Sequence, residues 1–531
     1  MHLSGWVGAG VLTAGVSAAL LTGAGAASAE TDGGSDPGPA KTSPSDGDEK
    51  TSSTRSSGHH RVKARLTHGD RPSTTAAKAA SRLRRAVDDT VEKAVDKTAE
   101  KPKAEQVPRQ RLSALRSEVR TQVRERLAPA TADTDAPDPL TAISQVASQV
   151  TEAVGSAVFN AIGTVIQTAD GPPVVPPALR DSVEVSSSTL VVSPGNEVPA
   201  DWYFPTHGEP ERLIYLQHGF LATGPMYSYT ASYLADRTNS VVVVTTVTSN
   251  PYTEGGMWLG GDNMHKAVAG LFLDPDRDAL NASMSTASLK AGRETIAMPQ
   301  RFVLVGHSLG GGFAPGVAGY YAEGLVARRA DGQDAPNDLA GVVLLDGVPP
   351  SGTLPNAMDR LAQLEASNGN DPADYVPVYE IGAPSNAFNS VSTVNDDLSA
   401  ARPGKFNGVV VDGGVHMDSM LGGNPLIQAA AYLVAGVPQP QNPPAVQWLM
   451  AGWINDMFEG NIDPATGRCL SDCHGTYGDA GEAVDIDGDR GDATAVVIDS
   501  GPSSDESGWS AAQFIPIAAT LIPASVRSQW A

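Results

Sequence analysis

A serine between two glycines, directly after an apolar run, constrains this chain more than any other feature. Residues 302–305 read Phe-Val-Leu-Val, and residues 306–310 read Gly-His-Ser-Leu-Gly before a small-residue segment that favours a helix. Gly-x-Ser-x-Gly between a buried strand and a helix is typical of a sharp turn that exposes the serine hydroxyl. Glycines flank such a serine because the turn leaves no room for side chains. The pattern predicts a nucleophile at Ser308; the alternative is a glycine-rich loop with an incidental serine.

Charge is unevenly distributed along the 531 residues. The formal net charge is −23, yet residues 51–127 are rich in Lys and Arg. The chain after residue 127 is strongly acidic. Acidic surfaces repel nucleic acid and anionic surfaces, so we expect no nucleic-acid partner. We interpret the basic arm as a solvated, charge-rich segment, with peripheral association with the cell envelope as the alternative.

The first 29 residues have the pattern of a signal peptide. Residues 7–21 are mostly apolar and small, and Ala27-Ser28-Ala29 fits a signal-peptidase site, although residues 1–6 lack Lys and Arg. No later run reaches the roughly 20 apolar residues of a membrane-spanning helix. We therefore expect a secreted or envelope-associated protein.

The chain has two cysteines, Cys469 and Cys473. After export they can close a short local disulfide loop. Cys473 is followed by His474, as in a haem-attachment motif. That motif has two residues between its cysteines, whereas this chain has three. We expect no organic cofactor and no metal.

Composition divides the rest of the chain into four regions. An amphipathic helix is predicted where apolar residues recur every three or four positions, and Gly171-Pro172-Pro173 marks its end. We expect that helix to dock on the domain that follows it, with membrane contact as the lesser alternative. The predicted regions are a low-complexity, basic, partly helical arm (30–138), the amphipathic helix (139–170), a catalytic domain (171–440) and an acidic C-terminal extension (441–531).

Apolar runs alternate with helix-like runs in the predicted catalytic domain. Continuous apolar strands separated by helices predict an α/β fold with a mostly parallel sheet covered on both faces. Ligands bind beyond the carboxyl ends of such strands. Two long insertions, 250–298 and 351–401, are candidate lids over that edge. The predicted strands are 213–217, 240–246, 302–305, 341–345, 376–381 and 408–411, and helices are predicted at 227–237 and 312–327.

A serine nucleophile needs a base, and a histidine base needs a carboxylate that sets its tautomer. In this type of fold the order along the chain is Ser, acid, His, which leaves His416 and His474. His416 follows a predicted strand and a Gly-Gly turn, as a loop over the sheet edge requires, whereas His474 lies in the polar tail. We therefore predict His416 as the base.

Asp346 is the predicted acid because it closes the strand that follows the one carrying the serine. Its alternative role is to cap the next turn. Glu380 on the following strand is the competing acid, although it precedes the last apolar residue of that strand. Asp418 is too close to His416 in sequence to orient it easily, and Asp412 requires the Gly-Gly turn to fold back.

The attack on a carbonyl creates an oxyanion, which preorganised N–H groups stabilise. Leu309, next to the serine, supplies one N–H. The loop His218-Gly219-Phe220 after the first central strand supplies the other, which we assign to Phe220. We interpret His218 as a residue that shapes this loop.

With these residues in place, the chain resembles the α/β-hydrolases from about Ser182 to Val437. Gly-His-Ser-Leu-Gly-Gly is frequent among lipases and esterases of this superfamily. The order from Ser308 to Asp346 is similar to the branches, including lipases and chlorophyllase-like hydrolases, that place the acid after the strand following the nucleophile. Most members place it one strand later, which keeps Glu380 as the alternative.

The resemblance implies an exported serine hydrolase that cleaves carboxylic esters of lipids or other hydrophobic acyl groups through an acyl-enzyme. The substrate is then a small-molecule or lipid ester. Two other readings use the same fold. One is a catalytically inactive module that binds the envelope, and the other is a thioesterase or acyltransferase with the same triad. The fold by itself does not choose among them.

Overall fold

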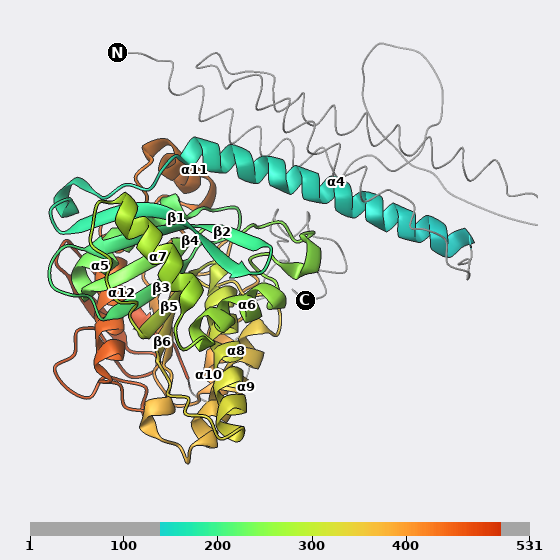
Figure 1. Cartoon of the computed structure of the whole chain (residues 1–531). Helices are drawn as coiled ribbons and strands as arrows, with labels where there is room; N and C mark the ends of the chain where they lie inside the picture. The colour runs from blue at the N-terminus through green and yellow to red at the C-terminus, as the bar shows by residue number, and fades with distance from the viewer. Residues whose placement is uncertain (1–138, 501–531) are drawn as a thin grey trace, which may run out of the picture. The chain divides into compact units, whose positions relative to one another are not determined.

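A ten-stranded, mostly parallel sheet forms the centre of the molecule in the computed structural model (Figure 1). The structure describes residues 139–500, with only the helical backbone for 139–154. The predicted signal peptide, the basic arm and residues 501–531 lie outside the described residues. The strand order is β1-β2-β4-β3-β5-β6-β7-β8-β10-β9. The strands are β1 (Val183–Ser193), β2 (Asn196–Pro205), β3 (Arg212–Gln217), β4 (Ser240–Thr245), β5 (Arg301–His307), β6 (Leu339–Leu345), β7 (Val378–Gly382), β8 (Gly408–Val411), β9 (Ala483–Gly488) and β10 (Gly491–Val497).

Strands β4, β3, β5, β6, β7 and β8 are parallel, and the outer strands pair antiparallel. Central strands are buried along nearly their whole length because both faces are covered by helices. The predicted α/β-hydrolase-type sheet is therefore confirmed.

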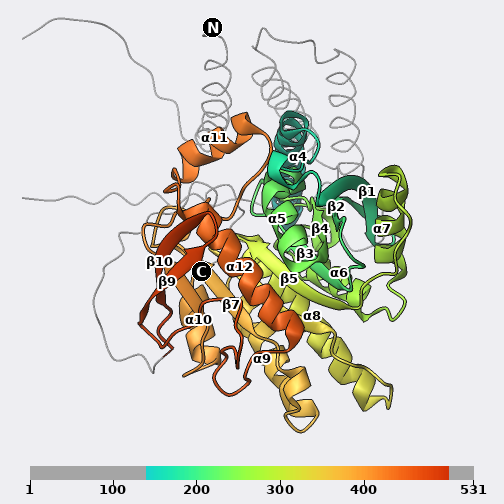
Figure 2. The same ribbon diagram turned by 90° about the vertical axis from the view of Figure 1, so that its left-hand side faces the viewer.

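Helices cover both faces of the sheet (Figure 2). Helices α8 and α6 pack on one face, and α5 and α12 pack on the other. The helices are α4 (Pro139–Asp170), α5 (Ser228–Thr238), α6 (Asp262–Leu273), α7 (Asp278–Lys290), α8 (Gly310–Ala330), α9 (Thr353–Ser367), α10 (Val394–Ala401), α11 (Pro425–Ala435) and α12 (Asn442–Glu459). Short 3-10 helices are η1 (Pro177–Leu179), η2 (Gly224–Tyr227), η3 (Glu254–Gly256) and η4 (Pro372–Asp374).

Side chains of each central strand alternate between two hydrophobic cores. On β3, Leu213 and Tyr215 join the core beneath α6 and α8, and Ile214 and Leu216 join the core beneath α5 and α12. The period of two follows from the pleat of a strand. No described helix is long and apolar enough to cross a membrane.

The two predicted lids need correction. Most of insertion 250–298 forms α6 and α7, which pack on α8 and β1. Trp258 and Phe272 are buried in the core beneath them, because burial of such large apolar surfaces stabilises the fold far more than a mobile position would. In insertion 351–401, α9 packs along α8, and only the loop that follows β7 approaches the predicted site.

The predicted boundary at residue 440 also needs correction. Strand β10 pairs with β8, and α12 packs on β5, β6 and β10. The chain after residue 440 therefore completes the sheet and covers one face of it. Its acidic composition concealed this role, because the buried residues of β9 and β10 alternate with exposed polar ones.

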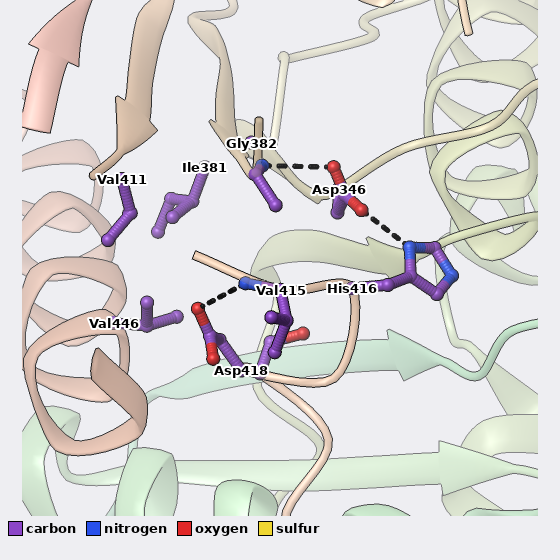
Figure 3. Close-up of a pocket in the computed structure, with 10 residues that line it drawn as sticks. Asp346, Ile381, Gly382, Val411, Val415, His416, Asp418 and Val446 are labelled. Atoms are coloured by element: carbon purple, nitrogen blue, oxygen red, sulfur yellow. Dashed lines mark hydrogen bonds and ion pairs between the residues drawn. The ribbon is translucent and has the colours of Figure 1, made fainter. Parts of the chain in front are cut away.

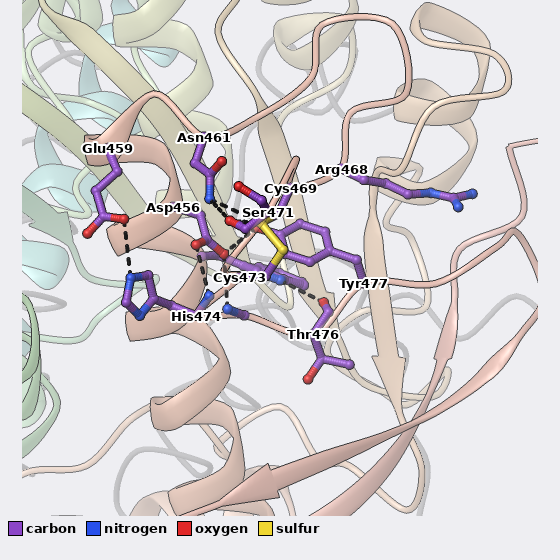
Figure 4. Close-up of a disulfide and its surroundings, with 12 residues drawn as sticks. Asp456, Glu459, Asn461, Arg468, Cys469, Ser471, Cys473, His474, Thr476 and Tyr477 are labelled. Carbon is purple, nitrogen blue, oxygen red and sulfur yellow. Dashed lines mark hydrogen bonds and ion pairs between the residues drawn. A yellow bond between two sulfur atoms is a disulfide. The ribbon is translucent and has the colours of Figure 1, made fainter.

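A disulfide joins Cys469 to Cys473 beside the end of α12 (Figure 4). The neighbouring group of Asp456, Glu459 and His474 has its ligand atoms within 4.8 Å of one another. Buried Asp456 already accepts hydrogen bonds from the His474 and Gly475 N–H groups and from the Tyr477 hydroxyl. This carboxylate therefore holds the loop after the disulfide against α12. His474 belongs to that loop.

Candidate active site

Ser308 lies in a strained turn between β5 and α8. Its φ angle of 55° is in the left-handed region, which side-chain-bearing residues seldom adopt. Its N–H donates to Leu345 O, and its carbonyl accepts from Val348 N, both contacts reaching the neighbouring strand end. A Cβ at Gly306 would lie 1.9 Å from the Gly310 carbonyl oxygen, which explains the flanking glycine. The serine itself stays half-buried.

His416 and Asp346 face each other at the carboxyl end of the sheet (Figure 3). The His416 Nδ1 lies 2.5 Å from Asp346 Oδ2, and both side chains are buried. Burial acts to raise the pKa of Asp346. The hydrogen bond and charge of His416, with further donors, outweigh burial and hold that pKa below its usual value. The carboxylate therefore stays ionised and accepts the Nδ1 proton.

Two donors hold the other oxygen of Asp346. The Ala383 N–H donates to Oδ1 at 3.0 Å, and the Asn389 Nδ2 donates to it at 2.9 Å. Asp346 adopts a φ of 43°, so the chain is strained at this residue as well. The carboxylate is thereby oriented with Oδ2 toward the histidine.

Two N–H groups near the serine have no acceptor within the described part of the chain. They belong to Phe220 and Leu309. A Cβ at Gly219 would lie 2.9 Å from Ser308 Cβ, so the loop that carries Phe220 runs directly against the serine. Such unpaired donors can bind a developing oxyanion. His218 is buried, its ring bonds to Gly219 O and Val247 N, and burial lowers its pKa to about 4.

Four residues at this centre escaped the sequence predictions: Tyr227, His307, Phe388 and Asn389. Phe388 stacks on the His416 ring with centroids 5.4 Å apart. Phe388 and Asn389 come from the second insertion, where no local pattern distinguishes them. His307 lies inside the serine motif, yet its partners Tyr227 and His416 are distant in sequence.

The alternative acids have other partners. Glu380 Oε1 accepts from Gly347 N at 3.0 Å, and its Oε2 has no partner among the described residues. Asp418 Oδ2 accepts from Val415 N, closing the turn that presents His416. Asp412 pairs through its N–H with Thr494 O.

Burial raises the pKa of Glu380 from 4.5 to about 8, and Asp346 adds to the rise. The folded protein therefore binds a proton that the unfolded chain releases between these values, so stability falls as pH rises through this window. The unfolding free energy of the wild type should fall between pH 5 and pH 9 as Glu380 loses its proton. In Glu380→Gln we expect that fall to be smaller by several kcal/mol, on an order-of-magnitude scale. Denaturant unfolding at both pH values measures it.

Glu294→Gln is the matched control, because Glu294 is exposed. This variant should keep the pH dependence of the wild type. An equal loss of stability with pH in wild type and Glu380→Gln would show that the Glu380 carboxyl does not hold its proton in the fold.

Asp346 and His416 also line a small pocket, together with other residues of the histidine loop (Figure 3). Ile381, Val411 and Val446 line it together with Asp418. Ser308 is not among its lining residues. The pocket therefore backs the histidine loop and is not where a bond to the serine would form.

The C-terminal half of α4 packs beside the loop that carries Phe220. The rings of Phe159 and Phe220 meet edge to face at 6.0 Å. Asn250 donates from Nδ2 to Ser156 and Asn160. The described part of α4 therefore packs on the domain through Ser156, Ala157 and Phe159. The predicted docking face needs correction, because Val158 and Val165, which belong to the apolar spacing that predicted the helix, are exposed.

No family model and no curated protein matches the chain. Solved structures that are similar include a thermostable esterase from Pseudomonas putida, at 13% identity and TM-score 0.31, covering 66% of this chain and 97% of that one. An esterase from Pyrobaculum calidifontis has 16% identity and TM-score 0.25 over 46% of this chain and 79% of that one. A carboxylesterase cloned from a metagenomic library has 16% identity and TM-score 0.23, covering 37% and 57%.

Proposed function

We propose that this chain is a serine hydrolase that cleaves carboxylic esters. The observation that carries the proposal is the position of His416. Its Nδ1 bonds to Asp346 at 2.5 Å, and its carbonyl oxygen accepts from the ring of His307, the residue before Ser308, at 2.8 Å. An oriented imidazole is thus tied to the turn that carries a strained serine.

In this mechanism His416 Nε2 removes the Ser308 hydroxyl proton while the oxygen attacks the ester carbonyl. Asp346 keeps the Nδ1 proton in place and stabilises the imidazolium that forms. The N–H groups of Phe220 and Leu309 bind the oxyanion. The imidazolium then protonates the departing alcohol, and an acyl-enzyme remains. Water, deprotonated by His416, attacks the acyl-enzyme, releasing the acid and restoring Ser308.

Hydrophobic acyl esters, including lipid esters, are the proposed substrates. Three aromatic side chains lie around the site: Phe159, Phe220 and Phe388. Apolar and aromatic linings favour apolar ligands. Export to the exterior or the cell envelope is also proposed, on the signal-like residues 1–29 and on the Cys469–Cys473 disulfide, a bond typical of oxidising compartments.

A series of p-nitrophenyl esters of increasing acyl length tests the function, together with a fluorophosphonate label located by mass spectrometry. We expect turnover that rises with acyl length and one label per chain, on Ser308. Turnover of thioesters alone, or transfer to an added alcohol, would change the reaction class on the same residues. Absence of both turnover and labelling would favour the binding module.

A further inference from the structure

Three hydrogen bonds connect the loop that carries Phe220 with the loop that carries His416. Gly219 N–H lies 3.1 Å from the Tyr227 hydroxyl, and that hydroxyl lies 2.5 Å from His307 Nδ1. At the other end of the ring, His307 Nε2 lies 2.8 Å from the carbonyl oxygen of His416. Tyr227 and His307 are both buried. His307, the middle member of the connection, directly precedes Ser308 in the chain.

The direction of each bond follows from the groups at the two ends. The His416 carbonyl can only accept, so His307 Nε2 carries the proton. In a neutral imidazole Nδ1 is then an acceptor, and the Tyr227 hydroxyl must donate to it. The oxygen of that hydroxyl remains free to accept from Gly219 N–H. Every donor and acceptor is used once, which leaves a single arrangement.

The ring of His307 is held neutral. Burial, followed by the neighbouring His416, lowers its pKa to about 3. Burial also raises the pKa of Tyr227 above its ordinary value. The two histidine rings have centroids 4.7 Å apart, so a charged His307 would oppose the imidazolium that His416 forms during the reaction. A neutral ring supports the carbonyl without this repulsion.

We propose that Tyr227 and His307 are positioning residues that hold the Phe220 N–H and the His416 imidazole in register about Ser308. This inference rests on the proposed function and concerns the same site. One end of the connection orients the peptide of Gly219, directly before the Phe220 N–H. The other end holds the backbone of the proposed base. Both groups must keep their places because a displacement of about 1 Å costs about 10²-fold in rate.

Tyr227→Phe removes the hydroxyl that joins the two halves. We expect kcat for a p-nitrophenyl ester to fall about tenfold or more with KM changed less than about twofold, because the groups that move act in the transition state. Tyr203→Phe is the matched control. Tyr203 is equally buried, but its hydroxyl has no hydrogen-bond partner among the described residues. It should retain wild-type kcat.

A pair of substitutions at His307 separates positioning from general support of the fold. In His307→Gln the side-chain amide can reach the place of Nε2 and donate to the His416 carbonyl. The shorter side chain of His307→Asn cannot. We expect kcat of the Gln variant to exceed that of the Asn variant about tenfold, at equal folded fraction by circular dichroism. The rate of fluorophosphonate labelling should follow the same order.

Nitrogen NMR of histidine-labelled wild type gives a readout that does not depend on activity. The His307 resonance should show hydrogen on Nε2 and none on Nδ1. Hydrogen on Nδ1, or equal kcat in Tyr227→Phe and Tyr203→Phe with an active wild type, would overturn the inference. A wild type that neither turns over esters nor takes the label would overturn the proposed function, and the catalytic role of this connection with it.

Discussion

Ser308→Ala is expected to lower kcat for a p-nitrophenyl ester by about 10⁵–10⁶-fold and to abolish fluorophosphonate labelling. The reason is chemical, because Ser308 carries the hydroxyl of the strained turn between β5 and α8, beside two N–H groups that have no acceptor among residues 139–500. The variant should keep a rate roughly 10³-fold above that in water, since the N–H groups of Phe220 and Leu309 remain in place. Steady-state kinetics and intact mass after labelling measure both effects.

The fold should tolerate this change. Alanine and serine are similarly disfavoured at a φ of 55°, so the unfolding free energy should stay within about 1 kcal/mol of wild type. Ser288→Ala is the matched control, because it makes the same chemical change at a buried serine whose hydroxyl has no partner among the described residues. It should keep full activity. Turnover by Ser308→Ala above about one per cent of wild type would mean that another group makes the attack.

The order of strands explains why so much of this centre could be predicted. In parallel strands all carboxyl ends meet at one edge, so residues that directly follow β5, β6 and β8 must come close together. Ser308 and Asp346 occupy such positions after β5 and β6, and His416 reaches the same edge from the loop that follows β8. Local patterns are enough for this step, because each strand is a continuous apolar run and each turn contains glycine.

Contacts made across long sequence distances could not be predicted in this way. Asn389 and Phe388 reach the site from an insertion whose path depends on the packing of α9 and α10. The hydrogen bond between Tyr227 and His307 can form only when β5 lies beside β3 in the folded sheet. A hydrogen bond between two polar side chains leaves no periodic trace in a sequence.

The last two strands show a different difficulty. Residues 483–497 alternate apolar and polar side chains, as an edge hairpin with one solvated face should. The many acidic residues nearby masked this signal and suggested a separate extension. The pairing of β10 with β8 depends on the unpaired edge that the parallel sheet leaves, which is a property of the whole fold.

Asp346→Asn is expected to lower kcat by roughly 10³–10⁴-fold. The surroundings of Oδ1 determine this result. Ala383 N–H and Asn389 Nδ2 both donate to that oxygen, so the amide oxygen of the new side chain must take its place. The amide NH₂ then points at His416 Nδ1 in the position of Oδ2. As a donor it favours the tautomer with hydrogen on Nε2, and that nitrogen can no longer accept the serine proton.

Two further variants test this account by steady-state kinetics. Asn389→Ala removes one donor to Oδ1 but leaves the carboxylate, so kcat should fall only about tenfold. In the double variant Asp346→Asn/Asn389→Ala, the new amide is less firmly oriented. The fold-decrease in kcat of the double variant should therefore be smaller than the product of the two single fold-decreases. Glu380→Gln is the matched control, because it makes the same chemical change in a buried carboxyl on the next strand that faces Gly347 and not His416. Loss of activity in Glu380→Gln as large as in Asp346→Asn would transfer the role of the acid to Glu380. Nearly full activity in Asp346→Asn would mean that the tautomer of His416 is set by some group other than Asp346.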